Sequence, residues 1–147
     1  MGLKLKVAPG ERLVLNGCIL RNTGAHRLEI ELENRADVLR GSEMLDAETA
    51  DTPVKRLCYL IQIALVSTRH RAEMLPEITA RTAELRSAMA ISHGADLDRV
   101  QALVEQAEFY AATRILQQVI RHEAKLLKLA EMRVRQAAEA AQTEGSA

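Results

Sequence analysis

The spacing of apolar residues changes once along this chain, near Thr52-Pro53. Before that point, apolar and polar residues alternate in short runs separated by turn residues, a pattern typical of β-strands with two unlike faces. After it, apolar residues recur at spacings of three and four, as in amphipathic helices. The chain therefore predicts an α+β fold, with a small antiparallel β module followed by a C-terminal bundle of about four helices.

Turn residues and charge place the boundaries between these parts. We expect the β module over 1–45, an acidic linker over 46–53, and a helical domain over 54–136. The last stretch, 137–147, is rich in alanine and ends in polar residues, so we expect a disordered or frayed tail there.

Four or five short strands are predicted in the β module, the fifth around Val38-Leu39-Arg40. Asn16-Gly17 is the pair best able to adopt the positive φ angles of a two-residue hairpin, and apolar triplets flank it on both sides. Strands of this length form a small barrel or curled sheet that needs a covering helix or a partner to be stable. The predicted strands centre on Leu5, Val14, Ile19, Ile30 and Leu39.

The first helix has a clear beginning, because Thr52 is suited to the N-cap and Pro53 to the first helical position. Its interior from Leu57 to Val66 is apolar nearly all round, so we expect it to be central or to lie in an interface. Further helices are predicted over 76–92, from Asp96, and from about Tyr110.

Composition limits the core and the location of the protein. Apolar residues make up 48% of the chain, but there is one Phe, two Tyr and no Trp, so the core must be aliphatic. No apolar run reaches the roughly 20 residues that span a bilayer, and the N-terminus lacks a signal-peptide core, so we expect no membrane contact and a cytoplasmic protein. Cys18 and Cys58 have apolar neighbours and are interpreted as small core residues.

Motifs for catalysis are absent from the sequence: it has no phosphate loop, dinucleotide turn or nucleophile elbow. Its four histidines fall on separate predicted elements, without metal-ligand spacing. We therefore expect no enzyme activity, no metal and no cofactor. Ser92, His93 and Asp96 are interpreted as capping groups at a helix end.

A series of motifs resembles the FlbT family of flagellar biosynthesis regulators. It comprises Leu3-x-Leu-Lys6-x-x-Pro9-Gly10-Glu11, Asn16-Gly17, Leu32-Glu33-Asn34, Val38-Leu39-Arg40, Met44, Thr52-Pro53-x-Lys55-Arg56-Leu57-x-Tyr59-x-Ile61-Gln62, and Glu108-Phe109-Tyr110-x-Ala112. The resemblance implies a post-transcriptional repressor that associates with the 5′ untranslated leader of flagellin messenger RNA and promotes its decay.

The β module also resembles the carbon-storage-regulator family of RNA-binding proteins, through Gly10-Glu11-Arg12-Leu13, Gly24 to Ile30, and Asn34 to Met44. In that family, basic residues of the first strand and an arginine past the last strand hold a single-stranded RNA loop. Val7-Ala8 stands here where that family has adjacent arginines.

Two hypotheses follow. In the first, basic residues of the β module and the adjoining helix start bind the flagellin messenger RNA leader; these are Lys4, Lys6, Arg12, Arg35, Arg40, Lys55 and Arg56. Although the net charge is zero, seven basic residues face five acidic ones between Lys4 and Arg40.

The second hypothesis is an adaptor or chaperone that binds flagellin or another flagellar regulatory protein in a helix-in-groove contact. Its contact residues would be Leu116, Val119 and Leu127. We also expect a homodimer, because small sheets expose unpaired edges, but the sequence does not place its interface.

Overall fold

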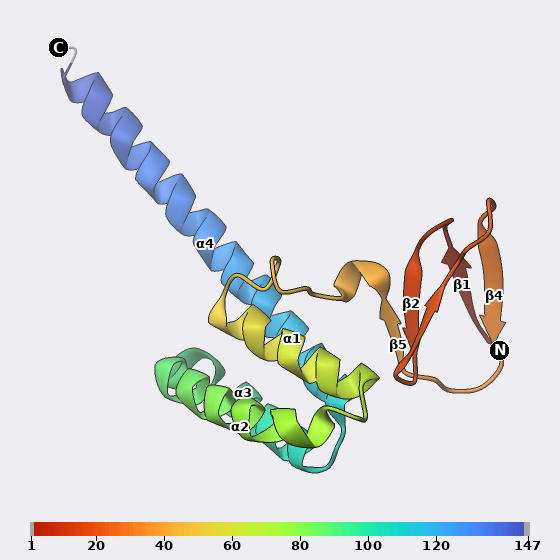
Figure 1. Cartoon of the computed structure of the whole chain (residues 1–147). Helices are drawn as coiled ribbons and strands as arrows, with labels where there is room; N and C mark the ends of the chain where they lie inside the picture. Colours follow the sequence, from red (N-terminus) through yellow and green to blue (C-terminus); the bar gives the residue numbers. More distant parts are fainter. Residues whose placement is uncertain (1, 146–147) are drawn as a thin grey trace.

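The computed structural model describes residues 2–145; residue 1 of the expected β module and residues 146–147 of the expected tail lie outside the described residues. It has a small antiparallel β module followed by four helices, which confirms the predicted α+β class (Figure 1). The strands are β1 (Leu3–Val7), β2 (Arg12–Leu15), β3 (Cys18–Arg21), β4 (Leu28–Leu32) and β5 (Val38–Arg40). A 3-10 turn, η1 (Gly41–Glu43), precedes the helices α1 (Pro53–Val66), α2 (Arg71–Ala88), α3 (Ala90–Glu105) and α4 (Phe109–Gly145).

The β module consists of two short sheets. β1 pairs with β4, and β2 lies between β3 and β5 in the order β3-β2-β5. Asn16 and Gly17 have φ angles of 48° and 81°, which confirms the predicted tight hairpin between β2 and β3. The module has its own small core, centred on the buried residues Leu5, Val7 and Leu13.

Asn22 holds the two sheets together at one corner of the module. Its side chain is buried and donates hydrogen bonds to the carbonyls of Val7 (3.0 Å) and His26 (2.9 Å). Its Oδ1 accepts from the N–H of Gly24 at 2.9 Å. One amide side chain therefore ties the end of β1 to the loop between β3 and β4.

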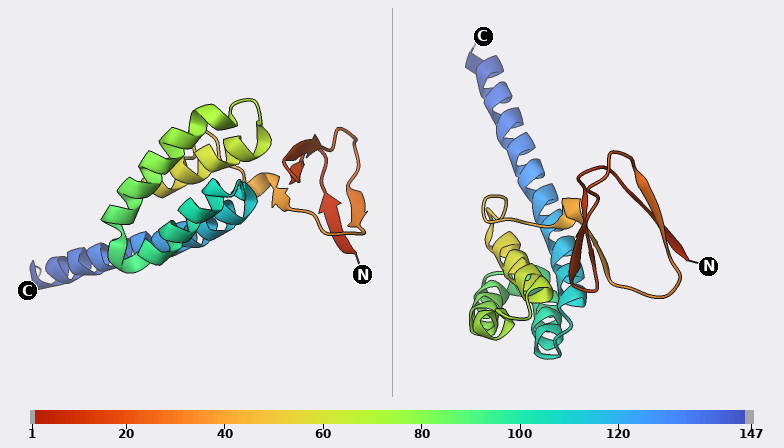
Figure 2. Two further views of the ribbon diagram at one scale, coloured as in Figure 1. Left: turned by 90° about the horizontal axis from the view of Figure 1, so that it is seen from below. Right: turned by 45° about the vertical axis from the view of Figure 1, so that its right-hand side comes forward.

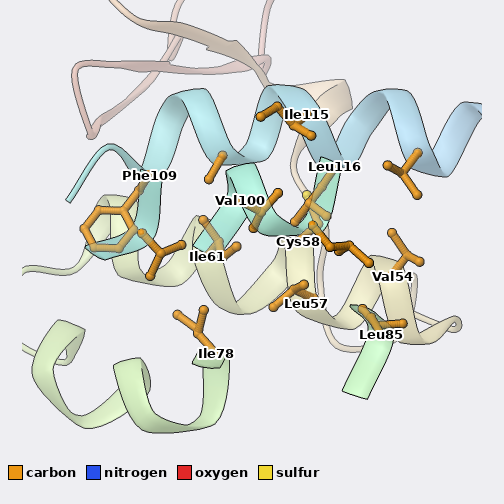
Figure 3. Close-up of a cluster of buried hydrophobic side chains, with 14 of the residues drawn as sticks. Val54, Leu57, Cys58, Ile61, Ile78, Leu85, Val100, Phe109, Ile115 and Leu116 are labelled. Carbon is orange, nitrogen blue, oxygen red and sulfur yellow. The ribbon is translucent and has the colours of Figure 1, made fainter. Parts of the chain in front are cut away.

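The four helices form a bundle in which α1 packs on α2 and α4, and α3 packs on the same two helices (Figure 2). Thr52 Oγ1 accepts a hydrogen bond from the N–H of Lys55, which confirms the predicted N-cap of α1. Leu57, Cys58 and Ile61 of α1 are fully buried among side chains from the other helices (Figure 3). The prediction that this apolar helix is central is confirmed.

Three boundaries differ from the prediction. α2 begins at Arg71, with Pro76 inside the helix. An interior proline loses one backbone hydrogen bond and crowds the carbonyl four residues earlier, and the packing of α2 on α1 and α3 offsets that cost. α2 ends at Ala88, and α3 begins at Ala90 and kinks at His93, where φ is −138°. α4 continues as helix to Gly145, although fraying was expected after residue 136.

The expectation that Cys18 is a core residue was wrong: Cys18 is exposed on β3, an edge strand. β3 is exposed at all four positions, and its apolar residues Ile19 and Leu20 remain 48% and 41% exposed. Cys58 is buried, as predicted. Within residues 2–145, none of the helices combines the length and apolar character needed to cross a bilayer.

Candidate functional site

Lys4 and Lys6 lie on the exposed face of β1, where we expected them. Residues directly opposite in an antiparallel pair are close neighbours, and the partners here are Glu31 and Glu29 of β4. The first strand therefore presents a surface of mixed charge, and the two lysines share it with two carboxylates.

Arg12 has a different neighbour. It is exposed on β2, directly opposite Arg21 of β3. Like charges in this position destabilise a strand pair, and an anion between them would relieve the repulsion. Arg21 was not among the predicted site residues, although a hairpin closed at Asn16-Gly17 brings residue 12 opposite residue 21.

Arg40 has contacts within the β module itself. Its Nη1 donates a hydrogen bond to the carbonyl of Lys6 at 3.0 Å and lies 3.5 Å from the carboxylate of Glu11. Because Lys6 is in β1 and Arg40 is in β5, this guanidinium bridges the two sheets. Part of its hydrogen-bonding capacity is therefore already used in holding the fold.

Tyr110 and Arg114 of α4 dock the β module onto the helical bundle. The Tyr110 hydroxyl donates to the carbonyl of Val38 at 2.8 Å, and Arg114 donates to the same carbonyl at 3.1 Å. Arg114 also donates to the hydroxyl of Tyr110 and forms an ion pair with Glu43 at 2.7 Å. Partial burial of Arg114 would lower the pKa of its guanidinium, but the Tyr110 hydrogen bond and the charge of Glu43 raise it overall.

A pocket of about 460 Å³ lies beside these contacts, where the segment after β4 meets α3 and α4. We call it the junction pocket. The guanidinium groups of Arg35 and Arg99, which enter the pocket from the β module and from α3, form no hydrogen bond or ion pair with any of residues 2–145. Its lining comprises Arg35, Asp37, Arg99, Leu103, Glu108, Tyr110, Ala111, Arg114, Ile115 and Gln118.

The junction pocket combines chemical groups that the linear sequence keeps far apart. Three arginines face two carboxylates, and Tyr110 adds an aromatic ring that has the Arg114 guanidinium 5.1 Å from its centroid. Guanidinium groups bind phosphate in a bidentate manner, and both arginine and tyrosine stack on nucleobases. Of the pocket arginines, only Arg35 was among the predicted site residues.

Lys55 and Arg56 lie apart from the other predicted RNA-binding residues. They are in the first turn of α1, whereas the β2–β3 hairpin lies against the last turn of that helix, near Leu65. The Lys55 ammonium is 3.1 Å from Asp51 and lowers the pKa of that carboxyl. Arg56 donates a hydrogen bond to the carbonyl of Ala50 at 3.3 Å. The structure therefore does not bring these two residues to the β module.

The predicted partner-binding residues fall into two groups. Leu116 and Val119 are 0% and 1% exposed and belong to the core of the bundle, so the expectation that they contact a partner is corrected. Their periodicity is that of a core face, which sequence alone does not distinguish from an interface. Leu127, by contrast, is 54% exposed.

Two of the four histidines meet across the bundle. His93 Nε2 lies 2.8 Å from His122 Nδ1, and His93 Nδ1 lies 3.1 Å from Asp96. In the described part of the chain, no three His, Cys, Asp or Glu side chains are arranged to hold a metal ion. The His93–His122 contact links the start of α3 to the point where α4 leaves the bundle.

The fold defines a class of protein: a two-part α+β protein in which α4 of a four-helix bundle holds a small β module through hydrogen bonds. The chain belongs to the FlbT family, because the family model described as "Flagellar protein FlbT" matches residues 3–127. This confirms the resemblance noted from the motifs.

Curated relatives carry related names. A "Flagellum biosynthesis repressor protein FlbT" of Caulobacter vibrioides is 26% identical over 127 residues, which cover 84% of this chain and 87% of that protein. A "Probable flagellum biosynthesis repressor protein FlbT" of Caulobacter sp. strain K31 is 32% identical over 84 residues, covering 57% of this chain and 63% of that protein. A "Probable flagellum biosynthesis repressor protein FlbT" of Brucella anthropi is 26% identical over 136 residues, which cover 86% of this chain and 83% of that protein. No solved structure matches this chain.

Proposed function

We propose that this protein represses flagellin expression after transcription by binding the 5′ untranslated leader of flagellin messenger RNA and promoting its degradation. The observation that carries the proposal is membership of the FlbT family over residues 3–127. Relatives aligned over most of their length are named flagellum biosynthesis repressors, and a repressor of this kind needs a surface that recognises its target.

The junction pocket supports RNA as that target. The guanidinium groups of Arg35 and Arg99 have no hydrogen-bond or ion-pair partner within residues 2–145, so a phosphate could bind them without breaking such a bond. Tyr110 in the same pocket supplies a ring against which a base can stack. We assign Arg35 and Arg99 the role of phosphate contacts.

The Arg12–Arg21 pair supplies a second group of contacts. Both residues are exposed, and each lies where a phosphate would lower the repulsion between them. Lys4 and Lys6 contribute less in this proposal because Glu31 and Glu29 lie opposite them. Arg40 acts mainly by holding the two sheets in register, and Lys55 and Arg56 lie outside the contact surface.

Binding to a flagellin leader RNA, measured at several salt concentrations against a scrambled RNA of equal length, tests the proposal. We expect sequence-selective binding that persists near physiological salt. The double variant Arg35→Ala with Arg99→Ala should weaken binding at least tenfold and lower the dependence on salt, because two phosphate contacts are lost.

A matched control is Arg81→Ala with Arg135→Ala, which removes the same charge from α2 and from the far part of α4. We expect nearly unchanged affinity. Equal losses in both double variants would show that only net charge matters and would overturn the assignment of the junction pocket. Absence of selective binding in the unmodified protein would overturn RNA recognition and favour the adaptor hypothesis.

A further inference from the structure

The core-facing side of α4 continues far beyond the core that it serves. All buried residues described in α4 lie between Phe109 and Val119, whereas every residue from 124 to 145 is exposed. We call 124–145 the distal segment. It projects from the bundle as a straight rod (Figures 1 and 2), about 33 Å long at 1.5 Å per residue.

The three-and-four spacing of the buried part continues into the distal segment, with one interruption at Glu123. From Leu116, steps of four and three residues lead through Ile120 and Glu123 into an exposed line of apolar residues. We call this line the distal stripe. Two large side chains in it are strongly exposed, Leu127 at 54% and Val134 at 70%. The distal stripe consists of Leu127, Ala130, Val134, Ala137 and Ala141.

This repeat of three and four is the seam that pairs helices in coiled coils. Leu127 and Val134 are each followed by alanine along it, and small residues let two helix backbones approach closely while the large ones fill the space between. The bundle leaves this seam uncovered, although α1 and α3 cover its continuation as far as Val119.

The charges along α4 indicate which partner could cover the distal stripe and in which direction it would run. Residues 121–135 contain five basic and two acidic residues, a net charge of +3, whereas 136–145 contain two acidic residues and no basic one, a net charge of −2. Two parallel copies would place +3 beside +3. Two antiparallel copies place the acidic end of each helix beside the basic stretch of the other.

We propose that two copies of this chain pair through the distal stripe of α4, with their distal segments antiparallel. The contact is isologous, since the same stripe on each copy supplies both sides, and it closes as a two-fold dimer. A homodimer was expected from the sequence without a defined interface. This proposal puts the interface on α4 and not on the edges of the β module. The proposal is independent of RNA binding.

Substitution of the stripe tests the proposal in the full-length protein. Leu127→Asp with Val134→Asp puts carboxylates on the seam of both copies, so sedimentation equilibrium should shift from dimer to monomer. Both side chains are exposed in the single chain, so circular dichroism should show an intact fold.

The same helix offers a matched control. Leu129 and Met132 are 51% and 47% exposed but lie on the opposite side of α4 from the stripe. Leu129→Asp with Met132→Asp adds the same charge and removes a similar apolar surface. This variant should remain dimeric.

Disulfide formation reports the direction of the two helices. In a Cys18→Ser background, which removes the exposed thiol, we would prepare one protein with Glu123→Cys and another with Ala141→Cys. The two positions lie about 27 Å apart along the helix. Antiparallel pairing predicts a disulfide between the two proteins after mixing and little within either alone.

Three results would overturn the proposal. The unmodified chain could be monomeric at micromolar concentration, the dimer could survive Leu127→Asp with Val134→Asp, or each cysteine variant could cross-link to itself as parallel helices would. Survival of the dimer in the stripe variant would move the interface to another surface, such as the exposed edge strand β3.

Discussion

At the scale of single residues, Gln62 shows how a polar group inside a core fixes the path of the chain. It is 2% exposed, its Oε1 accepts from the N–H of Leu45 at 2.8 Å, and its Nε2 donates to the carbonyl of Glu43 at 3.0 Å. Both partners belong to the segment between β5 and α1. Gln62 therefore anchors that segment to the first helix.

We expect Gln62→Ala to lower the free energy of unfolding by about 2 kcal/mol, because it leaves the Leu45 N–H and the Glu43 carbonyl without their partner. Urea denaturation measures this change. Gln136→Ala, on the exposed part of α4, is the control and should change stability by less than about 0.5 kcal/mol. Equal effects of the two substitutions would contradict the anchoring role.

Cys58 gives a prediction on pH. Burial raises the pKa of its thiol from the usual 9.0 to about 12. The folded state therefore keeps the proton over a pH range in which the unfolded state loses it. The free energy that the neutral, buried Cys58 thiol contributes to stability is fully present below pH 9 and is lost as the pH rises toward 12.

In a Cys18→Ser background, the stability of the protein with Cys58 should fall relative to that of Cys58→Ala by about 1.4 kcal/mol between pH 8 and pH 10. Urea denaturation of both proteins at each pH measures the difference, and the titration of other groups cancels between them. Parallel stability curves would show that Cys58 ionises as readily in the folded state as in the unfolded state.

Single residues also show what the sequence could reveal and what it could not. The Asn16-Gly17 hairpin was predictable because its φ angles depend on those two residues. The meeting of Tyr110 with Val38 was not, because it joins positions 72 residues apart and depends on how the bundle packs. The junction pocket depends on the same contact, which is why Arg99 and Arg114 were missed.

At the scale of elements, helix starts were predictable where a capping side chain marks them. Thr52 and Pro53 mark α1 correctly, whereas α2 begins at Arg71 after His70, which makes no side-chain capping hydrogen bond. Pro76 is the strongest start signal in that stretch of sequence, and the predicted start of α2 therefore falls five residues late. Similarly, an apolar face identified α4, but its periodicity did not separate the buried Leu116 from the exposed Leu127.

The cap of α1 gives a prediction at this scale. Thr52→Ala removes the acceptor of the Lys55 N–H and should destabilise the protein by about 1 kcal/mol. Thermal unfolding followed by circular dichroism measures the loss. Thr68→Ala, in the exposed turn after α1, is the control and should leave the midpoint nearly unchanged; a comparable shift there would argue against a capping effect.

At the scale of the whole molecule, the β module and the bundle have separate cores joined by a polar contact. Arg114 contributes two bonds to that contact, with the Val38 carbonyl and with Glu43, and it also donates to the hydroxyl of Tyr110, which itself bonds to Val38. Because Arg114 and Glu43 are both partly exposed, water screens their ion pair, and its share of the stability should stay below about 1 kcal/mol.

Arg114→Met should therefore lower global stability only modestly but loosen the β module from the bundle. Hydrogen exchange should become faster in β5 and η1, while the buried part of α1 keeps its protection. Arg121→Met, an exposed position two turns further along α4, is the control. Unchanged exchange in β5 would mean that other contacts hold the module in place.

The unbroken course of α4 has one more consequence. The helix that carries Tyr110 at the junction with the β module is the same helix that ends at Gly145, about 53 Å away at 1.5 Å per residue. A rod of this length acts as a lever. A load applied near its tip is transmitted mechanically to the joint between the two halves of the protein, with no intervening hinge to absorb it.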